Sequence, residues 1–142
     1  MKQAIGIVFI CFLSSSLISQ NYVDSLQLLS QEEERDSLFY EKLYDFTKEI
    51  CKINPDTTLY YQEKFLQPSS DTSMFRGLGL CYLLKGIIEK DLGNYDKSIQ
   101  SNEQALKYLE SVDFKAGVAA IYNNLGTVYK RKALYKKALE VY

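Results

Sequence analysis

Apolar residues recur along this chain with the period of an α-helix. Between residues 31 and 52 they stand at spacings of three and four, apart from one adjacent pair, and they are Leu38, Phe39, Leu43, Phe46 and Ile50. This spacing places them on one face of a helix. Ser30 and Glu33 match an S-x-x-E capping box in front of that run. The pattern predicts a long helix from Gln31 to about Lys52, after a short helical lead-in.

The same periodicity predicts five further helices, which turn residues separate. The expected helices cover residues 56–67, 72–92, 95–110, 114–132 and 133–142. Asn54 and Pro55 form a turn, because proline cannot continue the preceding helix. Gly93 is typical of the residue just after a helix C-terminus, and Asp113 is expected to be the N-cap of the next helix. Residues 72–92 are apolar almost all round, which predicts a helix covered on several sides.

Much of the chain repeats at one fixed interval. Matched positions include Asn54 and Asn94, Asp56 and Asp96, Tyr82 and Tyr122, Gly86 and Gly126, and Tyr95 and Tyr135. A fixed period of about 40 residues marks a stacked helical repeat. We therefore expect an all-α fold, a right-handed superhelical array of antiparallel helix pairs (an α-solenoid). In it, Gly86 and Gly126 allow close helix contacts with the small residues Ser98 and Ala138.

The repeated residues resemble the tetratricopeptide repeat family. The third unit matches that motif at Tyr122, Leu125, Gly126, Tyr129, Tyr135, Ala138, Leu139 and Tyr142. The second unit matches at Tyr82, Gly86, Gly93, Tyr95, Ser98, Ile99, Ala105 and Leu106. It departs from the motif at Lys85, where leucine is usual, and at Glu89, where tyrosine is usual. The first unit is degenerate, with Phe46 where the motif has glycine or alanine.

The resemblance implies repeat units at about residues 38–72, 73–112 and 113–142, the last one truncated, after a lead-in segment at residues 20–37. The long period is similar to that of the extended repeats in bacterial sensor and regulatory proteins. It also implies that the first helices of the units line a concave groove that holds a protein or peptide segment. The implied groove residues are Asn123, Asn124, Thr127 and Lys130 in the third unit and Leu83, Leu84 and Ile87 in the second.

Asn124 matches the family's groove asparagine, which can both donate to and accept from a peptide backbone. Lys130 could meet a carboxylate, and the three apolar residues would form a pocket beside the polar one. The expected partner therefore carries an acidic, partly apolar segment. The alternative is that the asparagines only solvate a helix face or pack against a fourth repeat.

The segment Met1–Ser19 has the order of a secretory signal peptide. Lys2 is followed by an apolar run and then by small and polar residues up to Ser19. This predicts export, with the chain periplasmic or tethered to a membrane through a later segment. A short membrane anchor or a buried first helix is the alternative. We expect no membrane span in the rest of these residues, because charges interrupt the apolar run at residues 72–92.

The amino-acid composition excludes several kinds of catalytic and metal site. The 142 residues are 46% hydrophobic and include no histidine, which removes His-dependent triads and HExxH zinc sites from this segment. Cys51 and Cys81 are expected to be free thiols, because about 15 Å of axial offset separates them in the repeat. The net charge of −1 is uneven, since residues 21–71 hold 11 acids and 5 bases but residues 72–142 hold 7 acids and 11 bases.

No arrangement of residues satisfies the requirements of a catalytic, cofactor or metal site. We expect a non-catalytic protein-interaction scaffold, the N-terminal exported sensor or regulatory region of a longer bacterial signalling protein. Further repeats or an effector domain would follow Tyr142. Two alternatives stay open. One is a nucleic-acid-binding helical module that uses the basic cluster Lys130, Arg131, Lys132, Lys136 and Lys137. The other is the helical part of an enzyme whose catalytic domain lies beyond residue 142.

Overall fold

The computed structural model describes residue 17, residues 20–31 and residues 35–142. The signal peptide predicted at residues 1–19 therefore falls almost entirely outside the described part of the chain. After a helix at residues 20–29, the elements are α2 (Ser37–Ile50), α3 (Pro55–Phe65), the short 3₁₀-helix η1 (Thr72–Met74), α4 (Phe75–Asp91), α5 (Tyr95–Ser111), α6 (Lys115–Arg131) and α7 (Tyr135–Val141).

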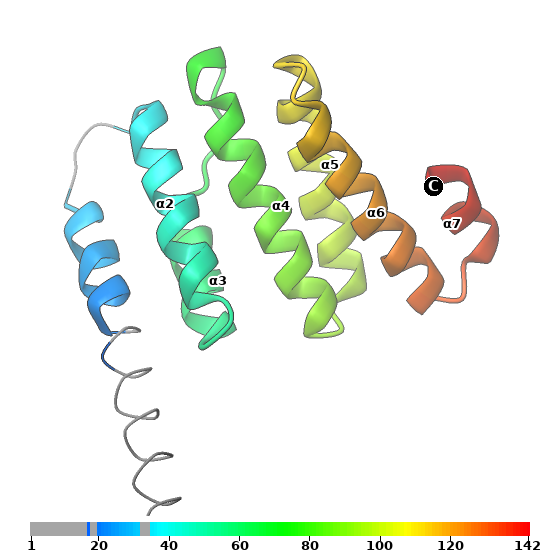
Figure 1. The fold of residues 1–142 in the computed structure, drawn as a ribbon, viewed down its shortest axis with the longest axis horizontal. Helices are drawn as coiled ribbons and strands as arrows, with labels where there is room; N and C mark the ends of the chain where they lie inside the picture. The colour runs from blue at the N-terminus through cyan, green and yellow to red at the C-terminus, as the bar shows by residue number, and fades with distance from the viewer. Residues whose placement is uncertain (1–16, 18–19, 32–34) are drawn as a thin grey trace, which may run out of the picture.

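The helices stack as antiparallel pairs in one row, which confirms the expected all-α array. Figure 1 shows α2, α4 and α6 towards the viewer, with α3 and α5 behind them and α7 at the end of the row. The described residues include no β-strand. Among those same residues, no helix combines the length and the apolar character needed to cross a membrane.

Side-chain caps decide where the early helices begin. The Asn54 side chain accepts a hydrogen bond from the Thr57 amide at 3.0 Å, and α3 begins at Pro55, one position before its predicted start. The predicted start of the preceding helix at Gln31 is wrong. Ser30 lies in a turn with its hydroxyl bonded to the Gln27 carbonyl. Asp36 is the actual N-cap of α2, since its carboxylate accepts from the Phe39 amide at 2.8 Å.

Three turns with the same backbone conformation connect the last four helices. A residue with positive φ stands at each turn, namely Gly93 (81°), Asp113 (52°) and Ala133 (57°), and the three are evenly spaced along the chain. At Asp113, the amide donates to the Glu110 carbonyl, and the next amide donates to that of Leu109. These bonds satisfy the last carbonyls of α5. The sequence-based assignment of Asp113 as an N-cap is therefore wrong, because this residue ends the preceding helix.

The core consists of two hydrophobic clusters that share α4. The first joins the helix at residues 20–29, through Leu26 and Leu29, to α2, α3 and α4. The second lies between α4, α5 and α6. Because Leu78 belongs to the first cluster and Leu83 to the second, α4 is covered on several sides, as its composition predicts. Cys51 and the buried Cys81 are both free thiols in the structure.

Gly86 allows α4 and α5 to approach closely. A Cβ added at Gly86 would lie 2.4 Å from the Asn102 Nδ2 and 3.2 Å from the Ser98 carbonyl oxygen. The Ser98 hydroxyl donates to the Gly86 carbonyl at 2.6 Å, so the predicted glycine–serine contact is confirmed. In the third unit, a Cβ at Gly126 would instead meet the Tyr142 ring at 2.5 Å.

We expect Gly86→Leu to lower the free energy of unfolding by about 3 kcal/mol, because the new side chain must enter a close backbone contact. Gly126→Leu is the matched variant. It should cost clearly less, since Tyr142 is 70% exposed and its side chain can move away. Denaturant unfolding of both variants tests this, and equal losses at the two sites would contradict it.

Candidate functional site

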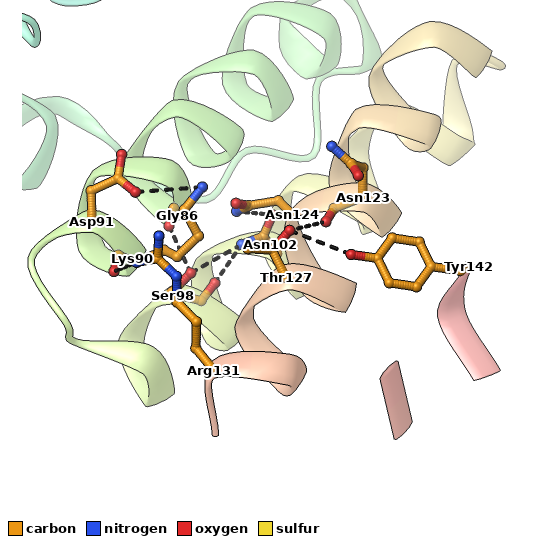
Figure 2. Close-up of polar contacts among 10 residues, drawn as sticks. All are labelled: Gly86, Lys90, Asp91, Ser98, Asn102, Asn123, Asn124, Thr127, Arg131 and Tyr142. Atoms are coloured by element: carbon orange, nitrogen blue, oxygen red, sulfur yellow. Dashed lines mark hydrogen bonds and ion pairs between the residues drawn. The ribbon is translucent and has the colours of Figure 1, made fainter. Parts of the chain in front are cut away.

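The residues expected to line the groove lie on α4 and α6, which are neighbours on the same side of the array (Figure 1). Asn123 and Lys130 are exposed, and Thr127 and Ile87 are half-buried. The Thr127 hydroxyl donates to the Asn123 carbonyl at 2.9 Å and lies 3.5 Å from the Tyr142 hydroxyl (Figure 2). These four residues, which we call the α4–α6 face, are the part of the predicted site that reaches the surface.

Asn124 lies inside the array and not on this face. Its side chain is 4% exposed and donates through Nδ2 to Asn102 Oδ1 at 3.1 Å. Asn102 in turn donates to the Ser98 carbonyl at 2.7 Å, and the Ser98 hydroxyl donates to the Gly86 carbonyl. Figure 2 shows this series, the Asn102 network, running from α4 through α5 to α6. The Asn124 amide thus joins consecutive units of the fold.

The apolar members of the predicted groove are also mostly interior. Leu83 and Leu84 are each 7% exposed. Leu83 packs in the second cluster with Leu109 and Ile121, between α4 and its neighbours. Of the three apolar residues, Ile87 alone has appreciable exposed surface. The expected apolar pocket is therefore reduced to one half-buried side chain beside the polar residues of α6.

The last turns of α4 and α6 carry three basic residues, Lys90, Lys130 and Arg131. The Arg131 guanidinium donates to the Lys90 carbonyl at 3.5 Å, which brings the two helix ends together. The Lys90 ammonium pairs with Asp91 at 3.5 Å, and Lys130 is exposed one residue before Arg131. Positive charge is favourable at helix C-termini. Sequence reasoning named Lys130 but did not place Lys90 and Arg131 beside each other.

The basic cluster considered for nucleic acid is divided among contacts within the chain. The Lys132 ammonium pairs with Asp96 on α5. The Lys137 ammonium lies 5.8 Å from the centre of the Tyr129 ring. With Arg131 bonded to a carbonyl of α4, three of the five cations already have partners. These five residues therefore do not form a single row of free cations along which a phosphate backbone could lie.

Comparison with known families agrees with this architecture. The family model described as Tetratricopeptide repeat matches residues 75–142. This part of the chain, α4 to α7, belongs to the tetratricopeptide repeat family. Comparison with curated proteins and with solved structures found no significant match. The preceding pair, α2 and α3, lies outside the matched residues but has the same antiparallel arrangement.

The second repeat holds a buried carboxylate at Glu89, one of the two positions where its sequence departs from the motif. Glu89 is 3% exposed and accepts a hydrogen bond of 2.6 Å from the Ser101 hydroxyl. Burial raises the pKa of the Glu89 carboxyl above its ordinary value, and this hydrogen bond and the charges of Lys85 and Lys97 oppose the rise only in part. Ionised Glu89 is therefore less favourable in the folded chain than in water.

We expect Glu89→Gln to raise the melting temperature at pH 7, by a few degrees. Because the folded-state pKa is raised, the fold loses stability as the pH rises from the ordinary glutamate pKa to the raised one, and this cost is fully present above the raised value. Glutamine removes that cost and keeps an oxygen for Ser101. Below about pH 4, where the carboxyl is protonated folded or unfolded, the gain should disappear.

Thermal unfolding at the two pH values measures this difference. Glu103→Gln, at an exposed position on α5, is the control and should change the melting temperature at neither pH. A melting temperature lower than that of the parent chain at pH 7 would show that neighbouring charges outweigh burial at Glu89.

Proposed function

We propose that this chain is a non-catalytic scaffold that binds a segment of another protein on its α4–α6 face. Tetratricopeptide repeats generally mediate protein–protein interaction, and residues 75–142 carry them. The observation that carries the proposal is the exposure of Asn123 and Lys130 on α6, beside the half-buried Thr127 and Ile87. The exposed Asn123 lies two turns before Lys130 on the same helix.

The chemistry of this face favours an acidic, partly apolar segment. An ammonium or guanidinium binds a carboxylate through charge-assisted hydrogen bonds, which are the stronger kind. The Asn123 amide can donate and accept, so it can bind a peptide backbone. Ile87 occupies on α4 the place that Thr127 occupies on α6, and offers one apolar contact. Because packed helices carry these side chains, the partner would meet a preformed surface.

Lys130→Ala and Asn123→Ala should each weaken binding of such a segment by about 1–3 kcal/mol, because each removes a hydrogen bond to a charged or backbone group. Peptides selected from a random display library on this protein supply the ligand, and fluorescence anisotropy measures their affinity. Selected peptides should be rich in Asp and Glu, and their affinity should fall as salt is added.

The control is Lys136→Ala, an exposed cation on α7 away from this face. It should leave the affinity unchanged. Peptides without acidic residues, or an affinity that falls with Lys136→Ala but ignores Lys130→Ala, would place the binding surface elsewhere. Asn124→Ala differs from Lys130→Ala and Lys136→Ala, because it should lower the stability of the fold by breaking the Asn102 network.

We also propose that the protein is exported as the sensor or regulatory region of a bacterial signalling protein. The charged start, apolar run and small residues of Met1–Ser19 support export. In this proposal, an effector domain or further repeats follow Tyr142, and the scaffold passes partner binding to them.

Export should remove Met1–Ser19. Mass spectrometry of the natively expressed protein should find an N-terminus at or near Gln20, with the protein outside the cytoplasm. An intact Met1 on a cytoplasmic product would refute the export proposal, and would leave the binding proposal unaffected.

A further inference from the structure

One hydrogen bond recurs in the first two units and shows which of their residues correspond. The Thr58 hydroxyl donates to the Thr47 carbonyl at 3.4 Å, and the Ser98 hydroxyl donates to the Gly86 carbonyl at 2.6 Å. Each bond joins the two helices of its unit, so Thr47 holds in α2 the place that Gly86 holds in α4. The sequence-based match, with Phe46 at that place, is therefore off by one residue.

With this correspondence, the second unit has charged residues where the other two units are apolar. They are Lys85 and Glu89, on successive turns of α4. The residues in their places are Phe46 and Ile50 in α2 and Leu125 and Tyr129 in α6. A buried charge costs free energy that an apolar side chain does not. Residues that break the pattern of their fold at such a cost are typical of functional sites.

Lys85 lines a cavity of about 320 Å³ between α4 and α5. The lining residues are Tyr82, Lys85, Gln100, Ser101, Glu103 and Gln104. Glu89 lies directly behind Ser101, whose hydroxyl donates to it at 2.6 Å. Towards α3, the Lys85 ammonium pairs with Glu63 at 3.8 Å. The cavity is internal to the array, because the α2–α3 pair packs on α4 from one side and α6 packs on α5 from the other (Figure 1).

Two buried acceptors beside this cavity lack donors. Ser101 donates to Oε2 of the Glu89 carboxylate, and within the described part of the chain no group donates to the other oxygen. Gln62 is fully buried and donates to the Cys81 carbonyl at 3.3 Å, one turn before Lys85, but its Oε1 has no partner among the described residues. A buried acceptor without a donor is unfavourable, so both groups favour a ligand that supplies N–H donors.

The charge around the cavity is acidic on balance. Glu63, Glu89 and Glu103 contribute three carboxylates against the one ammonium of Lys85. A guanidinium carries a positive charge and five N–H donors, and it accepts no hydrogen bond. This group therefore complements both the acidic charge and the missing donors.

We propose that this cavity binds a guanidinium group, which donates to the free oxygen of Glu89. The group belongs to a small free guanidinium compound or to an arginine side chain of a protein. Gln100 and Gln104 are exposed, so their side chains can turn aside as the group enters and accept from its outer N–H groups. Hydrogen bonds between a guanidinium and a carboxylate are of the stronger, charge-assisted kind. This site is separate from the α4–α6 face, which favours acidic ligands.

Two matched small molecules test the charge of the ligand. N-acetyl-arginine methylamide carries only its guanidinium charge, and N-acetyl-citrulline methylamide is its neutral analogue. NMR titration of the ¹⁵N-labelled protein with the arginine compound should give saturable shifts at Tyr82, Lys85, Ser101 and Gln104. The citrulline compound should bind about tenfold more weakly, because it has no charge for Glu89 to pair with. No saturable binding of the arginine compound, or equal affinity for the two, would overturn the proposal.

Butylguanidine distinguishes the two sources of the group. An affinity as high as that of the arginine compound assigns the site to small free guanidinium compounds. A clearly lower affinity assigns it to an arginine side chain, since the peptide groups then contribute to binding.

The affinity for the arginine compound should also depend on pH. Burial raises the pKa of the Glu89 carboxyl, and the groups that act on it besides are Ser101 and Lys97 on α5, Lys85 on α4 and Glu63 on α3. Only the ionised carboxylate attracts a cation, so the affinity should increase as the pH rises through that raised pKa. Glu89→Gln should remove this increase. The same pH profile in the parent chain and the variant would place the bound group away from Glu89.

Protein variants locate the contact at a fixed pH of 7. Glu89→Gln keeps the fold, which it is expected to stabilise, and should weaken binding about tenfold because the charged acceptor is gone. Lys85→Met removes a competing cation and should strengthen binding. Glu110→Gln, at an exposed position near the end of α5, is the control and should change nothing. Unchanged affinity in Glu89→Gln, or shifts confined to Asn123 and Lys130, would show that the cavity is not the site.

Discussion

The contact between the Gly86 backbone and α5 is the constraint on which the array depends. A glycine at this position brings the helices close enough for the Ser98 hydroxyl to reach a backbone carbonyl of α4. Asn102 then spans the remaining distance and accepts from Asn124 on α6. Most buried polar groups in proteins are hydrogen-bonded. Although Asn124 Oδ1 has no partner, the bonds that Asn102 makes to Ser98 and Asn124 fix the depth and register at which the third unit sits on the second.

Local sequence signals were sufficient for much of the fold. Pro55 after Asn54 and the glycine at position 93 mark helix ends through backbone restrictions that hold in any context. The prediction failed at Ser30 and Asp113, because short polar side chains serve equally as helix N-caps, turn residues and left-handed C-terminal residues. In the structure, Asp113 has the same left-handed backbone conformation as Gly93 and Ala133, which shows that it follows the end of α5 and is not the N-cap of α6. The three turn residues are of different types, Gly93, Asp113 and Ala133, so the local sequence does not mark the shared backbone conformation.

Only some of the predicted groove residues reach the surface, because burial depends on tertiary packing between the units. Position in the repeat identified the helices correctly, but exposure depends on how closely neighbouring units pack. Leu83, Leu84 and Asn124 become buried because α4 contacts α6 directly and α5 supplies a polar partner. No periodicity in one helix contains that information. The sequence did indicate this for residues 72–92, because a segment that is apolar almost all round is expected to have little exposed surface.

The sharing of α4 between two cores has a consequence for cooperativity. A linear array of repeats can open one unit at a time when each unit contacts only its neighbours. Here α4 takes part in both clusters, and Tyr108 of α5 reaches into the first. The units from α2 to α6 are thereby coupled into one cooperative block. α7 has Ala138 as its one buried residue and joins the second cluster through the partly buried Val141. Since it buries the least of these helices, local opening should begin there while the interior stays closed.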